Sequence, residues 1–144
     1  MSGSGLSGLE ESADCMDLMQ AMIEEISARL VIDDRGLILH QYTRRMVSGT
    51  FGQKWVQQMA TEGKVIRVHW DQLDRRTQVE LQEAHFDRED YRYVRTAATS
   101  RSRRLVAHDP DYSARVRRIL HRRLSVDVCG APAACTFVRL RLGR

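Results

Sequence analysis

The chain lacks the features that mark membrane-bound or disulfide-linked proteins. No apolar run approaches the roughly 18 residues of a membrane-spanning helix, and no basic start followed by an apolar stretch marks a secretion signal. The three cysteines (Cys15, Cys129 and Cys135) are an odd number without a CxxC pair, which disfavours a disulfide scaffold or a zinc site. We therefore expect a reduced, cytoplasmic protein that has no contact with a membrane.

Two further absences narrow the kind of enzyme that the chain could be. The glycine-containing segment at 49–52 lacks the lysine and the spacing of a phosphate-binding loop. No serine or cysteine lies in the strand-to-helix turn that presents a catalytic nucleophile. Neither nucleotide binding by such a loop nor nucleophilic catalysis by serine or cysteine is expected.

The length and composition indicate one globular domain. A chain of 144 residues that is 42% hydrophobic is long enough to bury a core, yet too short for two typical domains. We expect a flexible N-terminal segment at 1–11, a folded domain at 12–130, and a C-terminal strand or basic tail at 131–144.

The net charge is +4, but acidic and basic residues are distributed unevenly along the chain. Residues 1–34 hold eight acidic residues and one arginine, whereas residues 92–123 hold ten arginines and two aspartates. Arginine guanidinium groups match phosphate oxygens well, so the second segment favours a polyanionic partner. A solvated arginine surface, in a chain whose only lysines are Lys54 and Lys64, is the alternative.

Hydrophobic spacing predicts alternating helices and short strands. Helices are expected over 12–28, 37–46, 51–59, 90–98 and 112–120, and strands at 30–32, 65–68, 105–107 and 126–128. The polar stretch 71–83 is expected to be a loop with a helical turn, and 136–142 an edge strand or a mobile basic end. This order predicts an α/β fold with a mainly parallel sheet covered by helices on both faces.

Several aspartates follow predicted strands. Right-handed crossovers bring the carboxyl ends of parallel strands to one edge of the sheet, where sites are built. Asp34, Asp109 and Asp111 come directly after strands, and Asp90 opens a helix that faces the same edge. Carboxylates gathered in this way suit a hard divalent cation.

Three segments together resemble the PIN-like nuclease superfamily over about residues 15–128. They read LVIDDRGLILHQY (30–42), FDREDYRYVRTA (86–97) and RLVAHDPDY (104–112). The resemblance implies a three-layer α/β/α fold and hydrolysis of phosphodiester bonds with Mg²⁺ or Mn²⁺ as cofactor. By position, Asp90, Asp109 and Asp111 would be the catalytic metal ligands.

The same resemblance suggests an endoribonuclease, in the manner of the toxin of a toxin–antitoxin pair. RNA is favoured over DNA as substrate, and an antitoxin or a second copy of the chain is a further expected partner. Four arginines before and within the third segment would hold the phosphates: Arg95, Arg101, Arg103 and Arg104.

Two departures from the family pattern support an alternative. Gln41 stands where the family has a glutamate, and nothing apolar precedes Ser12, so the first strand of the family and its aspartate are missing. The alternative is a catalytically inactive module that binds nucleic acid or protein. A third reading is a chain whose missing strand is supplied by a partner.

Ordinary structural roles also remain open for the singled-out aspartates. Asp90 suits the positive end of a helix dipole, Asp109 and Asp111 flank Pro110 as a turn and a helix cap would, and 33–34 suit a turn.

Overall fold

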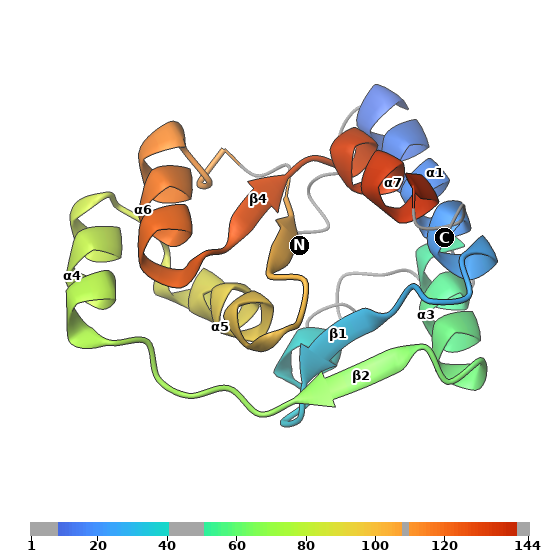
Figure 1. Cartoon of the computed structure of the whole chain (residues 1–144), viewed down its shortest axis with the longest axis horizontal. Helices are drawn as coiled ribbons and strands as arrows, with labels where there is room; N and C mark the ends of the chain where they lie inside the picture. Colours follow the sequence, from blue (N-terminus) through green and yellow to red (C-terminus); the bar gives the residue numbers. More distant parts are fainter. Residues whose placement is uncertain (1–8, 41–50, 108–109, 141–144) are drawn as a thin grey trace.

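The computed structural model describes residues 9–40, 51–107 and 110–140, in which helices alternate with short strands (Figure 1). The helices are α1 (Leu9–Glu24), α3 (Phe51–Thr61), α4 (Arg75–Glu83), the short 3-10 helix η2 (Arg88–Asp90), α5 (Tyr91–Thr99), α6 (Ala114–Leu124) and α7 (Ala131–Leu140). The strands are β1 (Leu30–Asp33), β2 (Val65–Val68), β3 (Arg104–Val106) and β4 (Asp127–Cys129). This mixture of helices and small parallel sheets confirms an α/β fold. Within the described ranges, no helix combines the length and the apolar character needed to cross a membrane.

The strands form two separate parallel pairs rather than one sheet. Leu30 lies opposite Val65 in the pair β1–β2, and Arg104 lies opposite Asp127 in the pair β3–β4. In Figure 1, β2 points away from α7 toward the loop that leads to α4, whereas β4 points toward α7. The prediction that all strand carboxyl ends meet at one edge is therefore wrong for these two pairs. The physical reason is that no described strand is hydrogen-bonded to both pairs, so nothing imposes a common direction on them.

The main core lies where α5 and α6 pack on the strands. Val94, Val116, Leu120 and Val126 are fully buried there, and Ile32 of β1 joins the same cluster. Their removal from water supplies the main favourable free energy for this half of the fold. A cavity of about 190 Å³ separates the cluster from α1 and runs between β1 and β3.

Helices α1 and α7 pack against each other at the opposite side of the molecule (Figure 1). Cys15 and Leu18 of α1 bury the small side chains of Ala131 and Ala134 on α7. The prediction of a strand or basic tail at 131–144 is wrong for the described part, because Ala131–Leu140 is helical. Ala131, Ala134 and Val138 recur at helical spacing, and this face is buried against α1.

The polar stretch 71–83 also differs from its prediction. Asp74 caps a nine-residue helix there, accepting hydrogen bonds from the amide and the hydroxyl of Thr77. Leu73, Thr77 and Leu81 are buried at intervals of four residues and attach α4 to the core. The turn assignment of Asp33 is confirmed, since its buried carboxylate accepts from the amides of Leu37 and Ile38. Gln41 and the rest of the helix predicted at 37–46 lie outside the described residues.

Candidate nucleic-acid interface and predicted metal site

Two of the three predicted metal ligands belong to the part of the chain that the structure describes. Asp90 ends η2 and is half-buried, and Asp111 is exposed ahead of α6, whereas Asp109 lies outside the described residues. The residues that follow them, Tyr91 and Tyr112, both contact Phe86, with ring centroids 5.9 Å and 5.1 Å away. The structure thus brings the chain at position 90 and the chain at position 111 to one aromatic cluster.

Asp90 occupies the N-cap position of α5, and Asp111 precedes the cap of α6. Asp90 makes no side-chain capping hydrogen bond to α5, and the cap of α6 is Ser113, which accepts from the amide of Val116. Among the described residues, no three histidine, cysteine, aspartate or glutamate side chains converge to hold a metal ion. The predicted site needs Asp109 as its third ligand, so it stays a prediction.

The four predicted phosphate-binding arginines differ in their contacts. Arg95 lies over the ring of Trp70 and donates to Gln72, and Arg104 lies over the ring of Phe137, 3.8 Å from its centroid. Arg103 has a left-handed backbone (φ 51°) and donates to the carbonyl of Leu124, while Arg101 is exposed. These arginines lie on α5, in the loop after it and on β3, and the contacts of their side chains differ accordingly.

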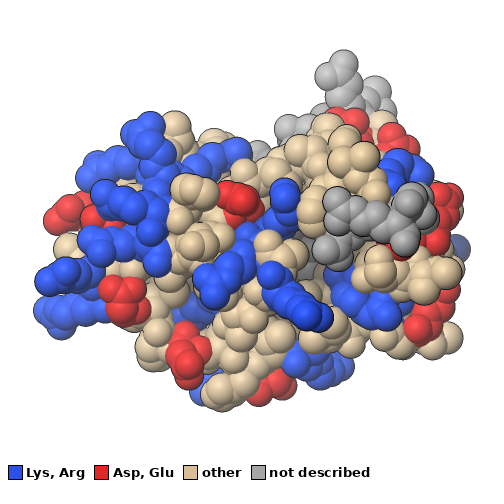
Figure 2. Space-filling view, viewed as in Figure 1, with Lys and Arg blue, Asp and Glu red and all other residues tan. Residues whose placement is uncertain are grey.

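Helix α6 carries more arginines than α5, the loop after it or β3. Val116, Ile119 and Leu120 of the sequence ARVRRILHRRL point into the core, which leaves its basic residues on the outer side of the helix. Figure 2 shows Lys and Arg crowded over the side of the molecule where Figure 1 places α4 and α6. We call this surface the α6 arginine face; it consists of Arg115, Arg117, Arg118, His121, Arg122 and Arg123.

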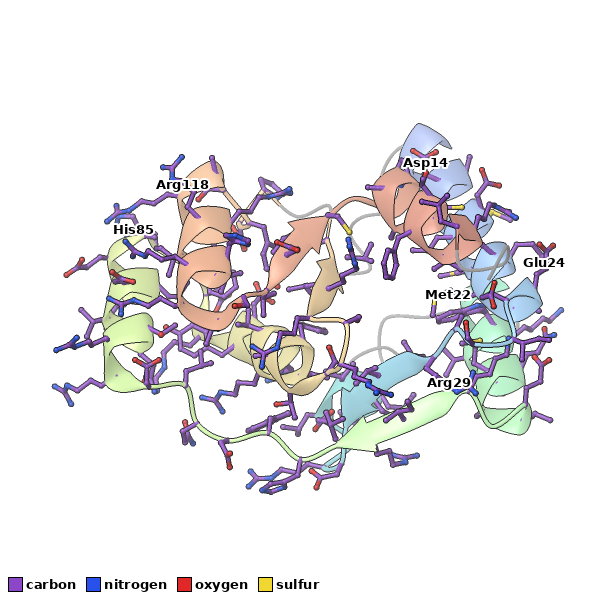
Figure 3. All side chains as sticks on the ribbon, viewed as in Figure 1. Asp14, Met22, Glu24, Arg29, His85 and Arg118 are labelled. Carbon is purple, nitrogen blue, oxygen red and sulfur yellow. The ribbon has the colours of Figure 1, made fainter. Side chains whose placement is uncertain are left out.

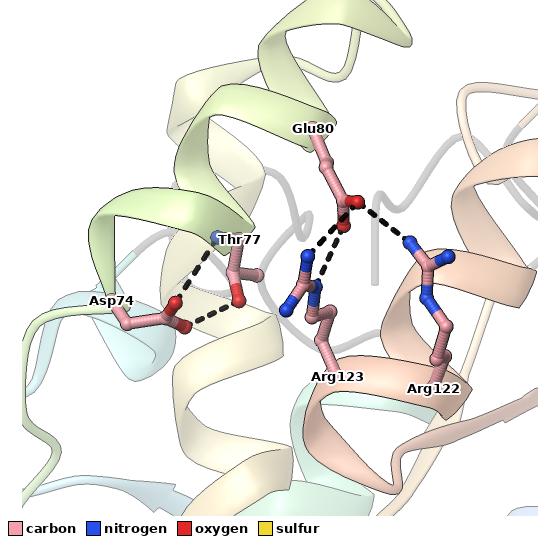
Figure 4. Close-up of polar contacts among 5 residues, drawn as sticks. All are labelled: Asp74, Thr77, Glu80, Arg122 and Arg123. Carbon is pink, nitrogen blue, oxygen red and sulfur yellow. Dashed lines mark hydrogen bonds and ion pairs between the residues drawn. The ribbon is translucent and has the colours of Figure 1, made fainter.

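Part of the α6 arginine face is engaged within the protein. Glu80 of α4 accepts from Arg122 at 2.7 Å and from Arg123 at 2.9 and 3.1 Å (Figure 4). The hydrogen bonds from Arg123, and then those from Arg122, lower the pKa of Glu80 to about 2. Arg117 donates to the carbonyls of Tyr112 and Val128.

Arg115 and Arg118 are the available members of the face. Both are exposed, and within the described residues neither has a hydrogen bond or an ion pair. Figure 3 shows Arg118 on the outer side of α6, far from Asp14 and Glu24 on α1. An open groove of about 470 Å³ runs beside them between α4 and α6, lined by Glu80, Glu83, Arg115, Arg118, Ile119, His121 and Arg122.

The arginines of α6 were part of the basic segment 92–123 noted in the sequence, but they were not predicted as binding residues. The available signal was the helical period within RVRRILHRR, in which the apolar residues share one face and the basic residues share the other.

No protein-family model, no curated protein and no solved structure matches this chain.

Proposed function

We propose that the chain is a nucleic-acid-binding module that contacts phosphates through the α6 arginine face, with single-stranded RNA as the preferred ligand. The observation that carries this proposal is the pair Arg115 and Arg118, exposed and without a partner among the described residues. A guanidinium group binds phosphate through two parallel hydrogen bonds, so two unpaired arginines on one face favour such a ligand.

The dimensions of the face suit a strand rather than a single anion. Arg115 and Arg122 are seven residues apart, which is about 10 Å along a helix axis. Neighbouring phosphates of a strand lie only several ångströms apart, so a face of this length can contact more than one of them. The acidic residues of α1 lie at the other end of the molecule (Figure 3), and would orient a polyanion toward α6.

The test is a titration of a fluorescently labelled 12-nucleotide RNA, followed by anisotropy at several salt concentrations. Replacing both available arginines (Arg115→Gln with Arg118→Gln) is expected to weaken binding about tenfold. The negative slope of log K against log salt should become shallower by about 1.4, since each phosphate contact to a single strand contributes about 0.7 to its magnitude.

A charge-matched control removes two exposed arginines elsewhere, Arg67→Gln with Arg101→Gln. Neither residue has a hydrogen bond or an ion pair within the described residues. This control is expected to change the affinity less than twofold. Equal losses in the two double variants, or an affinity that does not change with salt, would contradict the proposal.

Metal-dependent cleavage is a second candidate, favoured by the shared contact of Tyr91 and Tyr112 with Phe86. In this candidate Asp90, Asp109 and Asp111 hold Mg²⁺ or Mn²⁺ in a PIN-like endoribonuclease. Carboxylate oxygens fit the preference of both hard cations, and a bound metal would activate water for attack on a phosphodiester. The two strand pairs would belong to a degenerate form of the three-layer PIN-like sheet.

Cleavage is tested with labelled RNA and Mn²⁺, with and without a chelator. Chelation and Asp111→Asn should each abolish cutting, and calorimetry should show weaker Mn²⁺ binding in the variant. Asp127→Asn is the matched control, because this carboxylate is exposed and pairs with His121. Cutting that persists in the chelator or in Asp111→Asn would exclude the second candidate and leave the binding proposal intact.

A further inference from the structure

A second cationic cluster lies at the carboxyl ends of β1 and β2, away from the α6 arginine face. Asp33 lies opposite Val68 in the register of this pair, so Arg35 and Trp70 follow two residues beyond each strand end. The guanidinium of Arg35 is 5.2 Å from the centroid of the Trp70 ring. Arg95 reaches the same ring from α5, at 4.8 Å.

The cluster is rich in donors and poor in acceptors. Trp70 is 8% exposed, and within the described part of the chain its indole N–H has no hydrogen-bond partner. The Nε of Arg95 is also buried without a partner among the described residues, and the Arg95 side chain donates elsewhere to the neutral amide oxygen of Gln72. Burying a donor without an acceptor is costly, so two such donors beside one ring indicate that an acceptor belongs there.

The charges of the cluster are likewise uncompensated. Neither Arg35 nor Arg95 has a carboxylate within ion-pair distance in the described part of the chain. The nearest acid in sequence, Asp34, is paired with His69 at 3.0 Å. Burial lowers the pKa of Arg95, and the positive charge of Arg35 adds to this effect. An anion bound beside these guanidinium groups would relieve both the repulsion and the loss of hydration.

We propose that Arg35, Trp70 and Arg95 form a binding site for a phosphate group. The deprotonated oxygens of a phosphate accept hydrogen bonds, which matches a cluster whose donors lack acceptors. The site lies at the carboxyl ends of parallel strands, where α/β folds place their ligands. Arg35 is exposed, and its flexible side chain can rotate to admit the anion beside the indole.

The indole N–H groups provide a direct measurement. The chain has two tryptophans, and the indole of Trp55 already donates to the carbonyl of Met19, which makes it an internal reference. In a ¹H–¹⁵N spectrum at constant ionic strength, inorganic phosphate should shift the Trp70 indole signal saturably and leave the Trp55 signal in place. Arg35→Gln should weaken this binding at least tenfold, while Arg67→Gln should leave it unchanged.

Three ligands distinguish the sources of the phosphate: inorganic phosphate, uridine 5′-monophosphate and the dinucleotide UpU. Binding of the first two alone assigns the site to a terminal phosphate, and equal binding of UpU assigns it to a backbone phosphodiester. No shift of Trp70 with any of them, an equal shift with chloride, or an equal loss in Arg67→Gln would overturn the proposal. The variant lacking Arg115 and Arg118 should still bind phosphate here, so this site fails or succeeds independently of the α6 arginine face.

Discussion

Lys64 illustrates how one side chain completes an element. Its ammonium is buried and donates to the carbonyls of Met22, Ile23 and Glu25 at 2.8–2.9 Å, which closes the C-terminal end of α1. Replacing it (Lys64→Met) removes the donor of the Met22 and Ile23 carbonyls, whereas the carbonyl of Glu25 keeps the amide of Ala28. The substitution should lower the free energy of unfolding by about 2–4 kcal/mol. Urea denaturation measures this loss.

The only other lysine of the chain is a natural control for that measurement. Lys54 is exposed on α3, so Lys54→Met should change the free energy of unfolding by less than about 0.5 kcal/mol. Equal effects of the two substitutions would mean that water replaces the ammonium of Lys64 at the end of α1.

At the scale of elements, Glu80 ties α4 to α6 through its pairs with Arg122 and Arg123. Its pKa is about 2 in the folded protein and 4.5 ordinarily, so its contribution is complete above about pH 4.5 and disappears as the pH falls through 2. Glu80→Gln should therefore lower the melting temperature above pH 5, and the difference from the parent chain should shrink between pH 4.5 and 2. Calorimetry over this range measures the difference.

Glu83 serves as the control for this pH dependence. It lies on the same helix, lines the same groove and has no ion pair among the described residues. Glu83→Gln should give a melting temperature that follows the parent chain throughout. A gap for Glu80→Gln that stays constant down to pH 2 would show that the ion pairs do not hold α4 to α6.

Elements with large apolar residues at regular spacing were predictable from the sequence. The helix at 112–120 carries Val, Ile and Leu at helical spacing, and the strand at 65–68 is rich in β-branched residues. Helix α4 was missed because Leu81 is the only large apolar residue that it buries, beside Thr77, and α7 was missed because it buries the small side chains of Ala131 and Ala134. Their partners, such as Leu18, are distant in sequence, and burial against them decides the structure.

At the scale of the whole molecule, the candidate sites depend on relations that no local pattern contains. The aspartates after the predicted strands could be identified, but their common edge required one sheet, and the strands form two pairs. The convergence of Arg35, Trp70 and Arg95 follows from the register of β1 with β2 and from the packing of α5 on β1. Sequence periods predict elements well because they are local, whereas register and packing angles depend on side chains from several elements at once.

The cavity of about 190 Å³ between the two strand pairs gives a test of how the two halves of the molecule meet. Ala97 of α5 lines this cavity, so Ala97→Leu can place three more carbon atoms in empty apolar space. Filling it should raise the free energy of unfolding by about 0.5–2 kcal/mol.

The matched control is Ala134→Leu, since Ala134 is as buried as Ala97 but lies in the close packing of α7 on α1, outside the cavity. Overpacking there should cost about 1–3 kcal/mol. Opposite signs in urea denaturation are expected because the same three carbons enter a space in one case and displace neighbours in the other; a loss in both would mean that β1 and β3 already lie in contact in solution.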